Sequence, residues 1–283
     1  MAVEVAPVSI SNSIWALGLP LVPLTTRQAV QAVDGLVQAR KPSYFITANL
    51  NYSMLTHRHE DLREINRQAA FILADGMPLV WTARWWGTPL PERVAGSDLI
   101  FELCRLAAER GYRVYLLGAH LSTAQKAAAT LVARYPGLQI VGTASPQLRD
   151  LSEAENAAVV AQVREARPDL LFVALGQPKG ERWIYTYHRD LEVPVSLQVG
   201  AALDFVAGRI RRAPTWLRQH GWEWAFRLFL EPRRLARRYL ENGLFFISKA
   251  LPCGSAKPLS PGNPNVVLRD TQLGLGPPNR PET

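Results

Sequence analysis

Short apolar runs alternate with longer amphipathic segments along most of the chain. Six of the runs have the length of a buried β-strand, at residues 44–48, 70–73, 113–117, 139–142, 170–175 and 195–199. The clearest segments of helix length are residues 59–68, 99–110, 122–134, 152–166 and 180–190. Strands that alternate with helices in this way predict a parallel sheet covered by helices on both faces. We therefore expect an α/β fold.

Polar residues and glycines follow each predicted strand. In an open parallel sheet, ligands bind beyond the carboxyl ends of the strands, so these residues are candidates for a site. They are Thr47, Asn49, Asn51, Asp75, Gly76, Gly118, Ser145, Pro146, Gly176, Gln177, Pro178, Lys179, Gly200 and Asp204. We expect the six strand ends to meet at one rim of the sheet.

Asp75 is the most distinctive of these residues. It follows the apolar run 71–74 and precedes Gly76, so its carboxylate should emerge at the mouth of the sheet on a backbone that is free to bend. Thr47 and Asn49 carry a hydroxyl and an amide that can orient a carboxylate or a substrate hydroxyl. Each has a structural alternative, which is an Asp-Gly turn or helix N-cap for Asp75 and strand-end capping for the other two.

Residues 176–180 (GQPKG) predict a rigid turn at a strand end, where Gln177 offers an amide and Lys179 an ammonium. These groups suit a sugar hydroxyl and a diphosphate. Gly118 stands shortly before a predicted helix, where backbone N–H groups can surround a phosphate, although a glycine there also suits a simple tight turn. The sequence contains neither the G-x-G-x-x-G fingerprint nor a P-loop motif.

The sequence offers little support for metal chemistry. No D-x-D pair occurs among the aspartates, and His57 and His59 have no cysteine or further histidine nearby, which favours an exposed helix start. The G-x-S-x-G motif of serine hydrolases is also absent from the sequence. We expect no metal and no cofactor, so that arginine and lysine would have to balance the charge of a diphosphate ligand.

Positive charge is concentrated in residues 208–249. This segment contains ten Lys or Arg residues and three Glu residues, in a chain whose formal net charge is +8. Pro232 can open a helix there, which would place Arg234, Arg237, Arg238 and Glu241 on one face, with Arg227 near the end of the preceding helix. Aromatic residues interleave with the arginines, at Trp216, Trp222, Trp224, Phe226, Phe229, Phe245 and Phe246. The composition suits a polyanion, an anionic membrane surface or both, and its structural alternative is a helix pair with a solvated basic face.

Length and composition set the expected organisation. A chain of 283 residues, 48% of them apolar, can bury the core of one large domain. The two cysteines, Cys104 and Cys253, are too few for a disulfide framework and favour a cytoplasmic setting. No window approaches the roughly 18 apolar residues of a spanning helix, so membrane contact should be peripheral. We expect a catalytic domain at residues 1–207, a basic helical appendage at 208–251 and a disordered tail at 252–283.

The ordered motifs together resemble the WecG/TagA/CpsF family of bacterial glycosyltransferases. The likeness runs from about residue 17 to residue 246. It rests on TAN at 47–49, ADGMP at 74–78, GTPLPERVAG at 87–96 with Asp98, LG at 117–118, YPG at 135–137, GQPK at 176–179 with Glu181, VG at 199–200 with Asp204 and Gly208, RAP at 212–214, GWEW at 221–224 and EPRR at 231–234. Two departures are Gly180, where the family usually has glutamine, and the bulky pair Trp85 and Trp86.

The resemblance implies a Rossmann-like, inverting transferase that needs no metal. Such an enzyme moves a sugar, often N-acetylmannosamine, from a UDP-sugar to a polyprenyl-diphosphate-linked saccharide. Asp75 matches the proposed catalytic base of the family, with Thr47, Asn49 and Gln177 as its polar neighbours. Asp204 matches a position at the nucleotide, and Gly118, Gly176 and Lys179 are the further candidates for the donor diphosphate. Arg227, Arg234 and Arg237 match arginines of an appendage that closes over the active site.

Residues and resemblance together lead to the hypothesis of a glycosyltransferase of cell-surface polysaccharide assembly, peripheral to the inner face of the cell membrane. Its expected partners are a UDP-sugar, a polyprenyl-diphosphate-linked acceptor and an anionic membrane surface. The same chemistry with a UDP-hexuronic acid is an alternative. A nucleic-acid-binding module explains the Arg and Trp composition but leaves the polar strand ends without a role. A nicotinamide dehydrogenase would need the glycine fingerprint.

Overall fold

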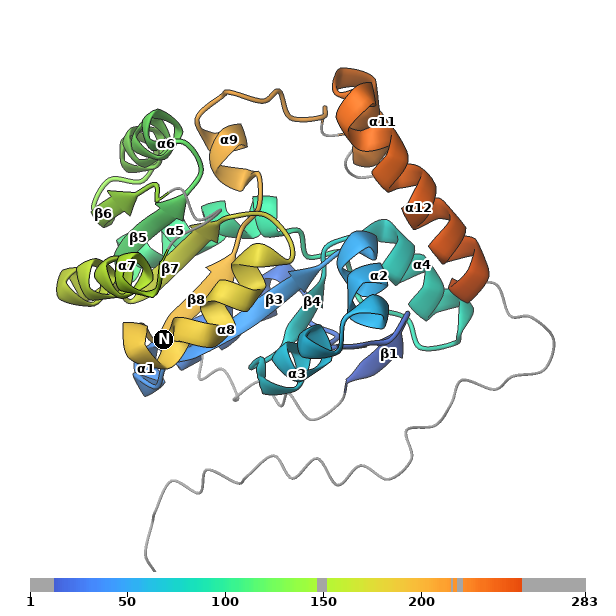
Figure 1. Ribbon diagram of the computed structural model, residues 1–283, viewed down its shortest axis with the longest axis horizontal. Helices are drawn as coiled ribbons and strands as arrows, with labels where there is room; N and C mark the ends of the chain where they lie inside the picture. Colours follow the sequence, from blue (N-terminus) through green and yellow to red (C-terminus); the bar gives the residue numbers. More distant parts are fainter. Residues whose placement is uncertain (1–12, 147–151, 215, 218–220, 251–283) are drawn as a thin grey trace, which may run out of the picture. The chain divides into compact units, whose positions relative to one another are not determined.

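A six-stranded parallel sheet forms the core of the described chain (Figure 1). The computed structural model describes residues 13–146, 152–214, 216–217 and 221–250. The strands lie in the order β4-β3-β8-β7-β5-β6, and every neighbouring pair is parallel. They are β3 Ser43–Ala48, β4 Ile72–Ala74, β5 Arg113–Gly118, β6 Gln139–Ala144, β7 Leu170–Ala174 and β8 Val195–Gln198. The predicted α/β fold is confirmed, with each strand within two residues of its expected bounds.

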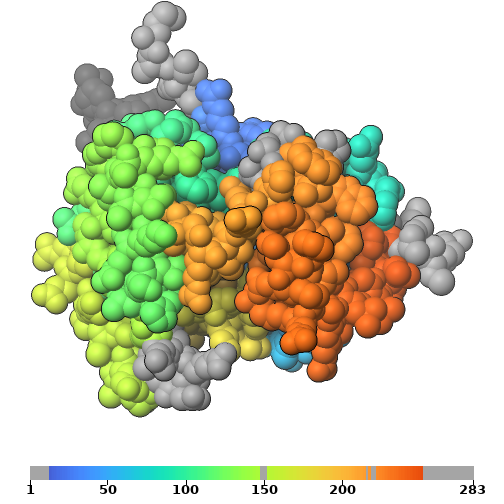
Figure 2. All heavy atoms as spheres, turned by 90° about the horizontal axis from the view of Figure 1, so that it is seen from above, coloured from blue at the N-terminus to red at the C-terminus, as the bar shows by residue number. Residues whose placement is uncertain are grey.

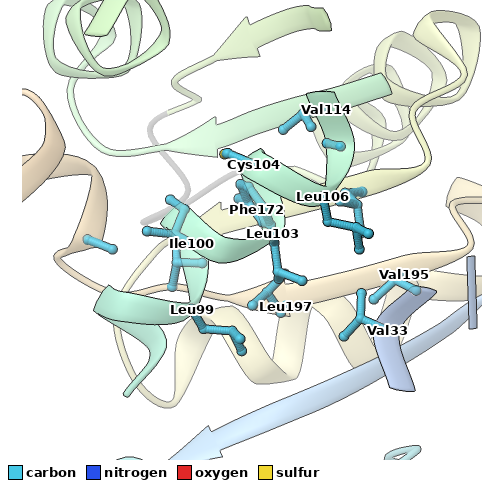
Figure 3. Close-up of a cluster of buried hydrophobic side chains, with 14 of the residues drawn as sticks. Val33, Leu99, Ile100, Leu103, Cys104, Leu106, Val114, Phe172, Val195 and Leu197 are labelled. Atoms are coloured by element: carbon cyan, nitrogen blue, oxygen red, sulfur yellow. The ribbon is translucent and has the colours of Figure 1, made fainter. Parts of the chain in front are cut away.

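Helices cover both faces of this sheet. One face carries α1 Thr26–Ala39, α5 Gly96–Arg110, α6 Leu121–Arg134 and α9 Ala202–Val206, and the other carries α2 Leu50–Arg58, α3 Glu60–Gln68, α4 Met77–Trp85, α7 Glu153–Ala166 and α8 Lys179–Leu191. Figure 3 shows the first face, where apolar side chains of α5 lie against Phe172 and Leu197 of the strands. Leu171 and Val173 point to the other face, because side chains alternate along a strand. Burial on both faces explains the continuous apolar runs of the sequence.

Capping side chains determine where several helices begin. Thr25 caps α1 and Ser152 caps α7, each in a capping box with the residue three positions later. Asn49 caps α2, since its side-chain oxygen accepts a hydrogen bond from the backbone N–H of Tyr52 at 3.1 Å. At the other end of α5, Gly111 adopts the left-handed conformation with φ 72°. Capping side chains and a left-handed glycine therefore determine where these helices begin and end, which the amphipathic pattern alone does not show.

A β-hairpin that the apolar pattern did not predict precedes the sheet. Strands β1 Ile14–Ala16 and β2 Leu19–Leu21 pair antiparallel across Leu17 and Gly18, whose φ angles of 47° and 77° give a two-residue turn with the twist that hairpins favour. The backbone N–H of Val22 donates to the carbonyl of Ile72 at 2.9 Å. The hairpin thus attaches to β4, the strand at the edge of the large sheet.

Two helices follow the sheet at the C-terminal end, α11 Glu223–Leu230 and α12 Pro232–Ala250. The start at Pro232 agrees with the sequence prediction. The ring of Phe245 meets that of His57 in α2 at 5.0 Å, and Phe246 meets Trp85 in α4 at 5.9 Å. These contacts attach α12 to the helices that follow β3 and β4.

The described residues belong to one compact unit, and the boundary expected at residues 207/208 stays a prediction. The predicted tail, residues 252–283, lies outside the described residues. Within the described part of the chain, the longest helix is too polar to cross a bilayer, and the others fall short in length or in hydropathy.

Candidate active site

The carboxyl ends of β4, β3, β8 and β7 border a cavity of about 530 Å³. Residues that directly follow these strands line one side of it, and residues of α11 and α12 line the other. In Figure 2 the orange and red atoms of the C-terminal segment gather on this face, beside the green atoms of α6. A cavity of this size beyond the carboxyl ends of parallel strands is the usual ligand site of an α/β sheet.

Most of the residues predicted for the site line this cavity, namely Thr47, Asn49, Asp75, Gly176, Gln177, Arg227 and Arg234. Gly118, Lys179, Asp204 and Arg237 are not among the residues that line it. The structure thus brings the expected polar strand ends together with two of the three expected arginines.

The residues outside the lining have other surroundings. Gly118 is the last residue of β5, which lies beyond β7 in the sheet. A Cβ atom there would lie 2.6 Å from the carbonyl oxygen of Ala174, so its φ of 97° serves a tight turn. Lys179 is exposed at the start of α8. Asp204 lies in α9, where its carboxylate is 3.9 Å from the guanidinium of Arg209.

Asp75 directly follows β4 and is held from several sides. Its backbone N–H donates to the carbonyl of Ala48 at 2.8 Å, and its carboxyl accepts a hydrogen bond from the backbone N–H of Gly96. Burial raises the pKa of this carboxyl to about 7, against the lowering effect of Arg93 and with a further raising effect from Glu223. A carboxyl with this pKa can accept a proton near neutral pH.

Gly96 brings Asp75 and Thr47 into one group. It is the first residue of α5, and a Cβ atom added to it would lie 2.8 Å from the hydroxyl oxygen of Thr47. Thr47 is 6% exposed. The backbone of Gly96 therefore approaches the hydroxyl of Thr47 more closely than any larger residue could, while its N–H reaches the carboxyl of Asp75.

The two amide side chains have different surroundings. Asn49 caps helix α2, and it also lines the cavity. The Nε2 group of Gln177 donates to the carbonyl of Thr47 at 3.5 Å, while its buried Oε1 has no hydrogen-bond partner among the described residues. Beside Gln177 lies Glu181, whose pKa burial raises to about 7.

Four arginines of the described chain line the cavity. Arg93 precedes α5, and Arg227, Arg234 and Arg238 come from α11 and α12. The pKa of Arg238 is lowered, first by the loss of water around its guanidinium and then by the positive charges of Arg227 and Arg234. These charges repel one another, so a bound anion would stabilise the group.

Arg237 lies on a different side of α12. Its side chain is 91% exposed, and its Nε donates to Glu241 at 3.0 Å. Arg238, one position later, lines the cavity instead. Successive residues of a helix point about 100° apart, which explains why one residue faces the cavity and the next does not.

Close contacts hold α11 against the sheet side of the cavity. Arg93 lies 3.4 Å from Glu223 of α11, and both side chains are largely buried. Gly221 precedes α11 with φ 78°, and a Cβ atom there would lie 2.5 Å from Cγ of Met77 in α4. The segment therefore docks by a buried ion pair and by a backbone approach that only glycine permits.

Within residues 13–146, 152–214, 216–217 and 221–250, no group of three or more His, Cys, Asp or Glu side chains is placed to hold a metal ion.

Comparison with known proteins decides the family. Residues 14–255 match the model of the glycosyl transferase WecG/TagA/CpsF family. The chain belongs to this family of glycosyltransferases. Similar proteins include the N-acetylglucosaminyldiphosphoundecaprenol N-acetyl-beta-D-mannosaminyltransferase of Bacillus subtilis (strain 168), 30% identical over 191 residues, which are 68% of this chain and 73% of the relative. A protein of the same name from Staphylococcus aureus (strain NCTC 8325 / PS 47) is 30% identical over 200 residues, which are 71% of this chain and 77% of the relative.

Sequence reasoning missed several residues of the glycosyltransferase cavity. Arg93 stands inside the block GTPLPERVAG that carried the resemblance, but no role was assigned to it. Glu223 is part of GWEW. In the sequence it is one of three glutamates in a basic segment, and nothing there sets it apart from the other two. Gln198 ends the strand β8, where the apolar run concealed its position at the rim.

The raised pKa of Asp75 makes a prediction about stability. The folded protein keeps this proton up to about pH 7, whereas the unfolded chain loses it near the ordinary value of 3.8. Ionisation therefore favours the unfolded chain, and the contribution of Asp75 lowers the free energy of unfolding as pH rises through this window. We expect Asp75→Asn to match the wild type in Tm near pH 4 and to exceed it at pH 8, as measured by thermal unfolding.

The control is Asp190→Asn, which alters an exposed carboxylate at the end of α8. Its Tm should follow the wild type across the same pH range. An Asp75→Asn protein that is less stable than the wild type at pH 8 would show that the cavity does not disfavour the charge.

Proposed function

We propose that this glycosyltransferase moves N-acetylmannosamine from UDP to an N-acetylglucosamine linked to a polyprenyl diphosphate, with inversion at the anomeric carbon and without a metal. The names of the two relatives support the transferred sugar and the acceptor. The observation that carries the proposal is the carboxyl of Asp75, with a pKa of about 7, in a cavity lined by arginines. A general base and a diphosphate-binding group are the two parts that such a transfer needs.

Asp75 is the base in this proposal. It takes the proton of the acceptor hydroxyl while that oxygen forms a bond to the anomeric carbon of the donor. The bond from this carbon to the diphosphate oxygen breaks, and its electron pair leaves with UDP. Attack from the face opposite the leaving group inverts the anomeric configuration. Thr47 and Gln177 line the same cavity and would orient the reacting groups.

Arg227, Arg234 and Arg238 bind the diphosphate in this proposal. Guanidinium groups donate paired hydrogen bonds to phosphate oxygens and keep their charge at any physiological pH. The Nε of Arg227 is buried and has no hydrogen-bond partner in the described chain, so it can donate to a ligand. Stabilising the charge that develops on the leaving group is usually the largest contribution to such catalysis.

An anionic membrane surface is the proposed site of action, because the acceptor lipid lies there. Leu240, Leu244 and Ile247 are 66%, 61% and 59% exposed and follow one another at helical spacing along α12. Phe229 of α11 is 83% exposed. Exposed apolar side chains near arginines suit the interface of an anionic bilayer, where apolar groups enter and cations meet the headgroups. The proposed location is the cytoplasmic face of the membrane.

The proposal predicts a large catalytic defect in Asp75→Asn. Turnover should fall by about two to four powers of ten, because an amide cannot take the proton of the acceptor. Affinity for UDP should stay near that of the wild type. In the wild type, kcat/KM should rise as pH increases through about 7, where Asp75 becomes ionised. Asp190→Asn serves as the control, and near-normal turnover of Asp75→Asn would remove Asp75 from the mechanism.

The proposed role of the arginines predicts that UDP binding weakens when they are replaced. Replacing Arg234 and Arg238 by Met should weaken UDP binding by at least about tenfold, because each charged hydrogen bond to a phosphate is lost. Isothermal titration in excess EDTA measures this, and the wild type should keep both affinity and turnover there. Arg233→Met alters an exposed neighbour that does not line the cavity and should bind UDP normally. Loss of wild-type activity on chelation, restored by magnesium, would contradict a metal-free mechanism.

The apolar stripe on α12 predicts membrane binding. Changing Leu240, Leu244 and Ile247 to Ser should reduce co-sedimentation with vesicles that contain phosphatidylglycerol by about tenfold or more, because less apolar surface enters the interface. Binding of the wild type should also weaken with salt. The matched control changes Leu121 and Val132 of α6, which are 47% and 44% exposed. Equal sedimentation of the two variants would rule out this surface.

A further inference from the structure

Gln198 is a buried amide that lines the cavity from the end of β8. The residue is 6% exposed, and its Nε2 group has no hydrogen-bond partner among the described residues. An amide donor that is buried without a partner costs free energy, so a ligand that accepts its hydrogen bond would be favoured. We propose that Gln198 determines donor specificity by donating a hydrogen bond from Nε2 to an oxygen of the transferred sugar.

The backbone fixes which end of this amide faces the ligand. Oε1 of Gln198 accepts a hydrogen bond from the backbone N–H of Gly200 at 2.8 Å. A carbonyl oxygen can fill this role and an NH₂ group cannot, so the orientation of the amide is settled. The NH₂ group is therefore the end that remains for a ligand, and it acts only as a donor.

Gly180 provides the space for this side chain. A Cβ atom added to Gly180 would lie 2.6 Å from Cγ and 2.8 Å from Cδ of Gln198. Gly180 lies in the first turn of α8 with no positive φ, so its backbone does not require glycine. A glycine inside a helix costs stability relative to alanine, and the packing of Gln198 is the reason that the structure offers for it.

Gln177 lines the same cavity, and the opposite end of its amide is the end without a partner. Its Nε2 donates to the carbonyl of Thr47, and its buried Oε1 has no partner in the described residues. One amide thus offers a donor and the other an acceptor, and neither carries a charge. A hydroxyl or an acetamido group both donates and accepts hydrogen bonds, which suits this pair.

Strand β8 ends where a ligand crevice opens in the sheet. The chain leaves β8 for α9 on one face of the sheet, while the neighbouring strands β3 and β7 lead to α2 and α8 on the other face, so a crevice opens at this strand. Strand β8 is two strands, about 10 Å, from β4 and Asp75. Within the described residues, three of the four arginines that line the cavity come from α11 and α12.

This inference rests on the proposed transfer from a UDP-sugar. The test measures kcat/KM for UDP-N-acetylmannosamine with a lipid-diphosphate acceptor analogue, together with the Kd for UDP. In Gln198→Glu a carboxylate oxygen can still accept from Gly200, but the donor is lost. Gln198→Met removes both groups at similar size. We expect kcat/KM to fall about 10- to 100-fold in both, while Gln198→Met binds UDP like the wild type.

UDP-mannose identifies the sugar oxygen. A loss confined to UDP-N-acetylmannosamine points to the acetamido carbonyl, and an equal loss with UDP-mannose points to a ring hydroxyl. Gly180→Ala should lower kcat/KM by displacing Gln198, and it should add little further loss in combination with Gln198→Met. The control is Ser196→Ala, which removes another buried, unpartnered oxygen from the same face of β8 outside the cavity lining.

Two results would overturn the inference: wild-type kcat/KM in both Gln198 variants, or a loss in Gln198→Met that appears equally in the Kd for UDP. A wild-type protein that binds UDP but transfers no sugar contradicts the proposed function instead. The affinity of the variants for intact UDP-N-acetylmannosamine then still tests Gln198.

Discussion

The burial of one carboxyl group between two distant parts of the chain is the constraint on which the cavity depends. Asp75 stands at the end of an edge strand, and a second segment more than a hundred residues later closes over it. Burial there opposes ionisation, and the ion pair of Arg93 with Glu223 places one charge of each sign beside the carboxyl. The same contact that docks α11 therefore also tunes the proton affinity of Asp75, so closure and acid–base chemistry share one set of residues.

Much of the fold follows from the sequence because burial on both faces of a parallel sheet leaves an unmistakable apolar pattern. The polar residues after β3, β4 and β7 converge for the same reason. The apolar pattern does not reveal the order of the strands in the sheet. Gly118 lies away from the cavity because β5 is beyond β7 in that order. Helical phase separates Arg238 from Arg237, which a motif match cannot resolve. Gln198 escaped notice because a polar residue at the end of an apolar run looks like part of the strand.

The positive charge of the C-terminal helices is only partly balanced within the fold. Arg234 pairs with Glu231 at 2.8 Å, and Arg93 pairs with Glu223, yet Arg227 and Arg238 bring further charge to the same cavity. Such an arrangement costs free energy through repulsion and through lost hydration. It is typical of a site whose electrostatics are complete only with an anion present.

Helix α12 presents two different surfaces on a cylinder about 10 Å wide. Arginines face the cavity on one side, and the apolar stripe of Leu240, Leu244 and Ile247 is exposed to solvent. One rigid element thus belongs to two binding equilibria. Thermodynamic reciprocity then applies. If contact with a surface strengthens binding of an anion in the cavity by some factor, the bound anion strengthens that contact by the same factor. Attachment of α12 to a surface and binding of the anionic substrate would then be linked by a single coupling free energy.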